Sequence, residues 1–319
     1  MPDAIFAEPK LAEIYDLLDS PDRPDLAPYL AIADEFHAHS VIDLGCGTGT
    51  LACRLAALGK EVVGIDPAAA SLSVAKRKAY ADRVRWITGT AAQLKGLHAD
   101  LITMTGNVAR VFVTDEEWMT TLRASRDALR PGGRLVFEVR DPTKEAWKGW
   151  NREQSYQTIE APGIGTVESW VELMNAQLPL VSFRHTFVFR KDGSVMTSES
   201  TLRFRTRSEI AETLSRAQLT VESVRDAPDR PGLEFVFIAH QSDQHGCQNK
   251  RRQQVAARRT GVLAFELRRR LFWQLEYASH RKTRGRFTLK HKHLPPIMST
   301  GRNIPGQTAP HLGYWNWKL

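Results

Sequence analysis

Hydrophobic and polar positions alternate with two different periods over residues 40–139. Short β-branched runs are followed by longer runs in which apolar residues recur every three or four positions. This pattern is typical of a parallel sheet with crossover helices, so we expect an α/β fold. The predicted strands are Val41–Leu44, Glu61–Ile65, Val84–Ile87, Asp100–Met104 and Arg134–Val139.

Helical periods precede and separate these strands. Two helices are predicted before the first strand, with apolar faces at Leu11, Ile14, Tyr15 and Leu18, and at Leu26, Tyr29, Leu30, Ala33 and Phe36. Leu51, Leu55 and Leu58 predict a helix that ends near Gly59. Thr114 and Glu117 form a capping box, so a further helix begins there and is stopped by Pro131-Gly132-Gly133.

The spacing of hydrophobic positions changes after the fifth predicted strand. Long alternating runs around the turn Lys191–Ser194 predict an antiparallel β insertion at about 166–205. A second capping box, Thr206 with Glu209, then predicts a helix, and two strands follow at Leu219–Val224 and Leu233–Ala239.

Charge divides the chain near residue 240. Residues 1–240 carry 28 Lys and Arg against 33 Asp and Glu, whereas residues 241–319 carry 16 against 3. We therefore expect N-terminal helices at 1–39 that cover a site, a folded domain at 40–240, and a basic tail at 241–319. The tail has no pattern that could bury a core, so it is either a disordered arm or a reading-frame extension that is not native.

Cysteine usage and hydropathy bear on the compartment. Cys46, Cys53 and Cys247 have no metal-ligand spacing and are odd in number, so neither a metal site nor a disulfide framework is expected. The N-terminus has acids where a signal peptide needs a basic start, and no window approaches the apolar length of a membrane span. These features favour a cytoplasmic protein with no membrane partner; they leave its oligomeric state open.

A glycine-rich loop follows the first strand. The sequence Gly45-Cys46-Gly47-Thr48-Gly49 joins a strand to a helix, which favours a ligand at the helix N-terminus. In the dinucleotide frame G-x-G-x-x-G the third glycine would fall on Thr50, so a nicotinamide dehydrogenase is disfavoured. Asp43 before the loop suits an ammonium group better than a pyrophosphate.

The stretches VIDLGCGTG, VVGIDP, RVRWITGTA, ADLITMTGN and LRPGGRLVFEV occur in this order. Together they resemble a class I S-adenosylmethionine-dependent methyltransferase, of the small-molecule methyltransferase-domain branch, over roughly residues 10–240. The resemblance implies a Rossmann-like, doubly wound, seven-stranded sheet, mostly parallel with an antiparallel last strand. It also implies S-adenosyl-L-methionine as the cofactor.

The resemblance carries over to individual residues. The cofactor-binding positions it implies are Asp43, Gly45, Cys46, Gly47, Gly49, Asp66, Pro67, Thr90, Ala91 and Thr105. Asp66 is similar to the acid that accepts from both ribose hydroxyls, and Pro67 is expected to start the next helix. Thr90 stands where the family usually has an acid for the adenine amine, so its hydroxyl or the Ala91 amide takes that place.

Methyl transfer needs alignment more than obligatory side chains, so candidate catalytic residues are chosen by position. They are Tyr15, Asn107, Arg140 and His185, with Glu138 and Asp141 as further possible bases at the end of the fifth strand. His185 shares a strand face with Phe183, Phe187 and Phe189, so a packing role is favoured over a base. No metal ligands are expected.

Three functions remain open. The leading hypothesis is methyl transfer to a small-molecule acceptor. The alternatives are an RNA methyltransferase that uses the basic tail, and a non-catalytic S-adenosylmethionine-binding protein. Adenine-N6 and cytosine-C5 transfer to nucleic acid are disfavoured, because the fourth-strand end TMTGNVARVF lacks both the Asn-Pro-Pro-aromatic sequence and the Pro-Cys pair.

Overall fold

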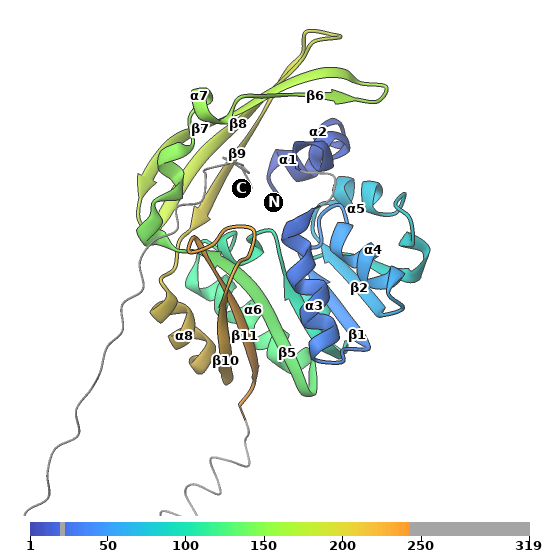
Figure 1. The fold of residues 1–319 in the computed structure, drawn as a ribbon, viewed down its shortest axis with the longest axis vertical. Helices are drawn as coiled ribbons and strands as arrows, with labels where there is room; N and C mark the ends of the chain where they lie inside the picture. Colours follow the sequence, from blue (N-terminus) through green and yellow to red (C-terminus); the bar gives the residue numbers. More distant parts are fainter. Residues whose placement is uncertain (20–22, 243–319) are drawn as a thin grey trace, which may run out of the picture. The chain divides into compact units, whose positions relative to one another are not determined.

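A seven-stranded sheet forms the centre of the protein (Figure 1). The computed structural model describes residues 1–19 and 23–242. The strand order is β10-β11-β5-β4-β1-β2-β3. The strands are β1 Ser40–Leu44, β2 Glu61–Asp66, β3 Val84–Thr88, β4 Ala99–Met104, β5 Leu129–Arg140, β10 Leu219–Asp226 and β11 Glu234–Gln241.

Strand directions confirm the predicted fold class. The strands β1 to β5 pair in parallel, and β11, the last strand of the sheet along the chain, is antiparallel to both β5 and β10. The order reverses at the β1–β4 pair, because the chain builds outward from β1 to β3 and then returns to β4 on the other side. In open α/β sheets such a switch point is where ligands bind.

Helices cover both faces of this sheet because successive strand residues point to opposite sides. On one face, α3 Ala27–Glu35 and α4 Thr50–Ala57 pack on residues such as Val41. On the other, α6 Asp115–Ala128 and α8 Arg207–Arg216 pack on residues such as Ile42. The short helix α5, Ala69–Ala75, follows β2 and contacts β2 and β3.

The predicted capping boxes are confirmed. The Thr114 side chain accepts from the Glu117 N–H, and Thr206 accepts from the Glu209 N–H; in both boxes the glutamate reaches back to the cap residue. The helix α6 ends at Ala128, before Pro131-Gly132-Gly133, and that tripeptide is part of β5.

A second, antiparallel sheet follows β5. Its order is β6-β7-β8-β9, with β6 Gln157–Ala161, β7 Gly165–Gln177, β8 Leu180–Phe189 and β9 Val195–Arg203. Three of these strands match the predicted insertion. The strand β6 and the short helix α7, Arg152–Ser155, were not predicted, because their segments carry too few apolar residues to show a period.

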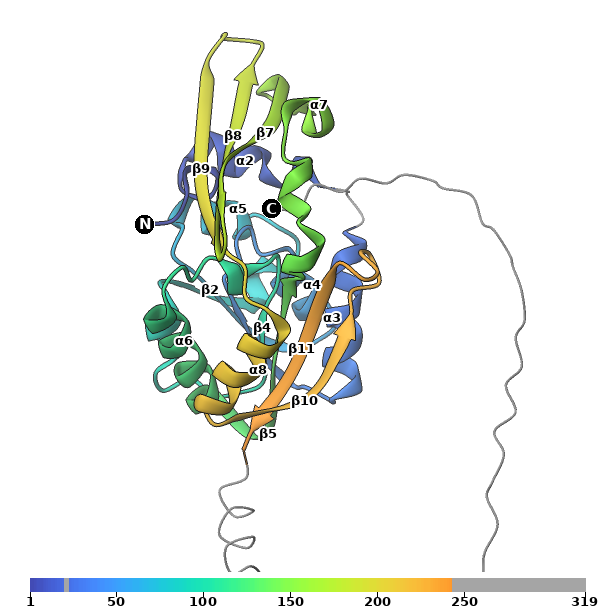
Figure 2. The ribbon, with the colours of Figure 1, turned by 90° about the vertical axis from the view of Figure 1, so that its left-hand side faces the viewer.

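The N-terminal segment packs between α5 and the second sheet. It forms α1 Ala4–Ala7, α2 Pro9–Ile14 and the 3-10 turn η1 Tyr15–Leu18. Ile5, Leu11 and Ile14 share a buried cluster with Phe187 and Phe189 of β8. Figure 2 shows α2 between the strands of the second sheet and α5, in agreement with the contacts of α1 and α2 with α5 and of α1 with β9.

The remaining connections are short 3-10 turns. They are η2 Pro24–Leu26, η3 Ala81–Arg83, η4 Ala91–Leu94, η5 Val108–Arg110, η6 Pro142–Lys144 and η7 Ala146–Gly149. Within the described residues, no helix has the length and apolar character needed to cross a membrane. The predictions made for the basic tail fall on residues 243–319, which lie outside the described part of the chain, so they stay predictions.

Candidate functional site

The glycine loop between β1 and α4 has a backbone that favours glycine. Gly45, Gly47 and Gly49 all have positive φ, at 76°, 51° and 75°. The N–H groups of Gly45 and Cys46 donate to the Ile65 carbonyl at 2.7 and 3.1 Å. The amides of the loop are therefore used in part to hold its own shape beside the end of β2.

The three glycines differ in what surrounds them. A Cβ on Gly45 would lie 2.5 Å from Val108, and one on Gly49 would lie 2.5 Å from the Trp86 ring. A Cβ on Gly47 would meet no described atom within 4 Å. Gly45 and Gly49 are thus required by packing, whereas Gly47 faces open space that a ligand can enter.

Asp66 ends β2 directly beside this loop and is 8% exposed. Its Oδ2 accepts from the Gly47 N–H and its Oδ1 from the Ala68 N–H, both at 2.8 Å. Burial raises the pKa of Asp66, while these two N–H groups act to lower it. Each carboxylate oxygen has a further lone pair, so the group can still accept from two hydroxyls.

Pro67 does not start the following helix. It is exposed, and α5 begins at Ala69 with Ala68 as its N-cap, so the prediction for Pro67 as a helix start is wrong. The reason is that the Asp66 carboxylate already accepts from the Ala68 N–H and holds the chain in a turn before the helix.

Asp43 lies beneath the loop in β1 and is 1% exposed. It accepts from the Thr103 hydroxyl at 2.9 Å. Burial raises the pKa of Asp43 to about 7, with a further increase from the nearby Asp66 carboxylate. Its partner in the described structure is therefore a hydroxyl, and the ammonium partner expected from sequence stays a prediction.

Thr90 caps a turn. Its N–H donates to Gln93 Oε1 at 2.7 Å, and its hydroxyl accepts from the Ala92 N–H at 3.4 Å, which forms a capping box for η4. Ala91 is buried behind it. Sequence reasoning missed Gln93, although the Thr-x-x-Gln spacing is a capping signal that could have found it. An adenine contact by Thr90 or Ala91 stays a prediction.

Asn107 and Glu138 meet where β4 and β5 end. Asn107, two residues after Thr105, has a φ of 65° and is 2% exposed. Its N–H donates to Glu138 Oε1 at 2.7 Å. The side-chain Oδ1 and Nδ2 of Asn107 and the Oε2 of Glu138 are buried and have no hydrogen-bond partner among the described residues. Such orphan atoms at a strand end are what a ligand is expected to satisfy.

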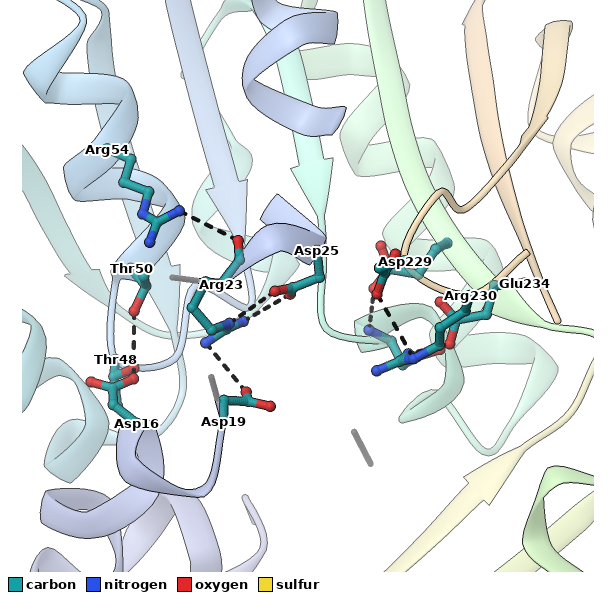
Figure 3. A network of polar contacts seen from close by, with 12 residues as sticks. Asp16, Asp19, Arg23, Asp25, Thr48, Thr50, Arg54, Asp229, Arg230 and Glu234 are labelled. Carbon is teal, nitrogen blue, oxygen red and sulfur yellow. Dashed lines mark hydrogen bonds and ion pairs between the residues drawn. The ribbon is translucent and has the colours of Figure 1, made fainter. Parts of the chain in front are cut away.

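These side chains line a pocket. It is bounded by Gly106, Asn107 and Glu138 at the strand ends, by Asp25 of η2 with Pro28 and Tyr29 of α3, and by Ala227, Pro228, Asp229, Arg230, Glu234 and Val236 around the connection from β10 to β11. Figure 3 shows Asp229, Arg230 and Glu234 gathered on one side and Asp25 across from them. The pocket is therefore rich in carboxylates, with apolar residues such as Tyr29 and Val236 completing its wall.

Arg140 is committed to an ion pair within the protein. Its Nε lies 3.0 Å from Glu234 Oε1, and Arg230 pairs with the same carboxylate. Burial lowers the pKa of Arg140 to about 10. Arg140 thus neutralises Glu234 beside the pocket, and the substrate contact expected from sequence stays a prediction.

Tyr15 belongs to a segment that is tied to the glycine loop. The next residue, Asp16, accepts from the Thr48 hydroxyl at 2.6 Å (Figure 3). Asp16 also pairs with Lys78 at 2.6 Å. The Tyr15 ring packs on Phe6 at 5.3 Å between centroids, and burial raises the pKa of its hydroxyl. The structure therefore brings Tyr15 close to the predicted cofactor loop, and its catalytic role stays a prediction.

His185 occupies the buried face of β8, as the alternation predicted. It is 5% exposed, and the centroids of the His185 and Phe187 rings lie 4.1 Å apart. Burial lowers the pKa of His185 to about 3, so the ring is neutral near pH 7. Its Nδ1 has no hydrogen-bond partner in the described part of the chain, so the ring is packed but not fully satisfied.

Comparison with known proteins points to methyl transfer. Residues 41–133 match the family described as methyltransferase domain. The chain is similar to the cypemycin N-terminal methyltransferase of a Streptomyces species, with 30% identity over 135 residues that make up 41% of this chain and 55% of that protein. The chain spans about half the length of the curated relatives it matches.

Solved structures share the fold over most of the described residues. The CcbJ methyltransferase from Streptomyces caelestis has a TM-score of 0.61 at 20% identity, and the match covers 73% of this chain and 96% of that one. An S-adenosylmethionine-dependent methyltransferase from Clostridium acetobutylicum has a TM-score of 0.60 at 20% identity, covering 73% and 98%. At this identity the likeness shows the fold alone.

Proposed function

We propose that this chain is a class I S-adenosylmethionine-dependent methyltransferase that transfers a methyl group to a small-molecule acceptor; the methyltransferase-domain match over residues 41–133 and the shared fold support this. The observation that supports this function most strongly is the hydrogen bond from the Gly47 N–H to the Asp66 carboxylate. It presents a buried strand-end carboxylate beside a loop glycine that faces open space.

The residues present fit S-adenosylmethionine. Asp66 would accept from the ribose hydroxyls, and Gly47 would allow the methionine part to approach the loop backbone. Thr105 and Asn107 would face the reacting methyl group at the end of β4. The bound cofactor supplies a methyl group on a positively charged sulfur.

The chain contributes mainly by positioning. In a direct displacement, the acceptor atom must lie in line with the methyl carbon and the sulfur, and much of the rate comes from holding that arrangement. The Asn107 N–H donates to Glu138 at 2.7 Å, and this hydrogen bond joins the ends of β4 and β5. We assign the pocket beside them to the acceptor.

We also propose that the N-terminal segment and the second sheet cover this site. Asp16 ties η1 to Thr48 of the loop, and Ile5 of α1 donates its N–H to Ser198 of β9 at 2.9 Å. A cover of this kind excludes water from the reacting groups.

Binding and transfer are tested separately. Isothermal titration with S-adenosylhomocysteine should give one site per chain, and S-adenosylmethionine labelled at the methyl group should pass its label to members of a small-molecule library. Titration without detectable binding would remove the cofactor assignment. Binding without transfer to any library member, but with transfer to RNA, would replace the small-molecule acceptor by RNA.

A further inference from the structure

We propose that the acceptor is an amine and that Glu138 receives its proton. This inference rests on the proposed methyltransferase function and concerns the pocket at the ends of β4 and β5. Glu138 and Asn107 both line that pocket and are at least nine-tenths buried; Glu138 lies in β5, and Asn107 follows the neighbouring parallel strand β4.

The polar atoms without partners define what the ligand must offer. Glu138 Oε2 and Asn107 Oδ1 are acceptors, and Asn107 Nδ2 is a donor. A buried carboxylate oxygen with no partner is costly, so a group that donates hydrogen bonds to it gains affinity. An ammonium or amine nitrogen carries several N–H donors on one atom, and it can satisfy Glu138 Oε2 and Asn107 Oδ1 together.

The charges around the pocket single out Glu138. The other three carboxylates of the pocket lie near arginines: Asp25 at 3.1 Å from Arg23, Glu234 at 3.0 Å from Arg140, and Asp229 at 3.8 Å from Arg230. Glu138 has no ion-pair partner among the described residues. Arg140 and Arg230 act on Glu138 only at longer range, so its free oxygen is open to a cationic group of a ligand.

Proton affinity favours an amine over an alcohol. Burial and the nearby Glu234 carboxylate raise the pKa of Glu138 to about 8. Amino groups have ordinary pKa values of about 8 to 10, so a proton can pass from an ammonium to this carboxylate at little cost. A general base works best when its pKa lies near the working pH, and a carboxyl of this kind is far too weak to ionise an alcohol.

The proposed step balances. The bound ammonium gives one proton to Glu138 Oε2, and the nitrogen lone pair then forms a bond to the methyl carbon. The carbon–sulfur bond breaks, and its electron pair stays on the sulfur, so the positive charge passes from sulfur to nitrogen. The methylated ammonium then leaves with S-adenosylhomocysteine, and the Glu138 proton passes to water.

A buried arginine supplies the competing interpretation. Arg110 is 1% exposed, and its three guanidinium nitrogens have no hydrogen-bond partner in the described residues. Its guanidinium carbon lies 5.0 Å from the Phe204 ring centroid. An anionic acceptor would suit it, but Arg110 does not line the pocket that contains Glu138. The amine is therefore favoured, and anion binding is an outcome of the test.

Three probes of equal length separate the alternatives. Protein saturated with S-adenosylhomocysteine is melted at pH 8 and constant ionic strength in rising concentrations of n-propylamine, 1-propanol or propionate. We expect a saturable rise in melting temperature with propylamine alone. Preferential stabilisation by propionate or propanol, or by none of the three, overturns the proposal.

Two variants make the test specific to the site. Glu138→Gln keeps an oxygen that can accept the Asn107 N–H but cannot take a proton, so the apparent affinity for propylamine should fall at least tenfold. Glu222→Gln is the matched control, because Glu222 pairs with Arg134 at 3.0 Å and does not line the pocket. A propylamine shift that survives in Glu138→Gln overturns the proposal.

Failure of this proposal is distinguishable from failure of the proposed function. Titration with S-adenosylhomocysteine alone measures the cofactor site, and its affinity in Glu138→Gln should stay within about threefold of the wild-type value. Should Glu138→Gln fold poorly, Asn107→Gly removes the second acceptor at a position whose positive φ suits glycine, and it should weaken propylamine binding in the same assay.

Discussion

The N–H of Gly47 donates to Oδ2 of Asp66 at 2.8 Å, so the tip of the glycine loop and the end of β2 are held together by one charge-assisted hydrogen bond. Oδ1 of the same carboxylate holds the turn into α5 through Ala68. Asp66 therefore has a local structural role, and it still has lone pairs for a ligand. The two roles can be separated by measuring stability and cofactor affinity on the same variants.

The variant Asp66→Ala should weaken the binding of S-adenosylhomocysteine by about 2–3 kcal/mol, because a charged acceptor is lost from two hydroxyls. Isothermal titration measures the change. Asp82→Ala, at an exposed position in η3, is the control and should bind normally. An unchanged affinity in a folded Asp66→Ala protein would remove the ribose assignment.

The variant Gly47→Ala tests whether the open space beside the loop belongs to the cofactor. A Cβ there meets no described atom within 4 Å, so its cost to folding is backbone strain of about 1–2 kcal/mol. Gly132→Ala carries a similar strain, since Gly132, within β5, also has positive φ and open surroundings. The melting temperatures of both variants should fall by similar amounts, but only Gly47→Ala should bind S-adenosylhomocysteine more than tenfold more weakly than the wild type. Equal affinities would place the cofactor elsewhere.

Local signals explain what the sequence could predict. The five parallel strands, both capping boxes and the position of Asp66 at the end of β2 follow from patterns that span fewer than about 20 residues. Such patterns act through neighbouring residues, so they survive into the fold. The glycine-rich loop between a strand and a helix belongs to the same class; the structure adds that Gly45, Gly47 and Gly49 have positive φ.

The acceptor pocket depends on contacts that no local pattern contains. Glu138 was one of several possible bases at the end of β5, and nothing in its neighbours along the chain distinguishes it. Glu138 differs from the other candidates because Asn107, 31 residues away, donates to only one of its two carboxylate oxygens and leaves the other without a partner in the described residues. Arg140 was a substrate candidate because Glu234, 94 residues further on, could not be foreseen as its partner.

Glu138 should make the protein less stable as the pH rises. Burial raises its pKa from 4.5 to about 8, so the folded state holds a proton that the unfolded state releases in this range. The stabilisation is complete below about pH 4.5 and is lost by about pH 8, with a slope of up to about 1.4 kcal/mol per pH unit. The contribution of Asp43 to stability also falls as the pH rises, and that fall is complete near pH 7.

Glu138→Gln removes this contribution. Its melting temperature should therefore gain on the wild type as the pH rises from 5 to 8.5, and the gain should continue above pH 7, where Asp43 no longer contributes. Glu222→Gln should run parallel to the wild type. A constant difference between Glu138→Gln and the wild type across this range would show that Glu138 titrates normally.

His185 should act in the opposite direction, on the acid side. Burial lowers its pKa from 6.5 to about 3, so below pH 6.5 the unfolded chain binds a proton at His185 while the folded protein does not. Its contribution to stability is complete above pH 6.5 and is lost as the pH falls towards 3. Between pH 6.5 and 4.5, the melting temperature of His185→Leu should therefore fall less than that of the wild type. His98→Leu, at an exposed loop position, is the control, and its melting temperature should change as the wild type's does. Methyl transfer separates the two interpretations of this side chain: a packed ring predicts a rate within a few-fold of the wild type in His185→Leu, and a loss of 100-fold or more in a folded protein would instead make His185 the proton acceptor.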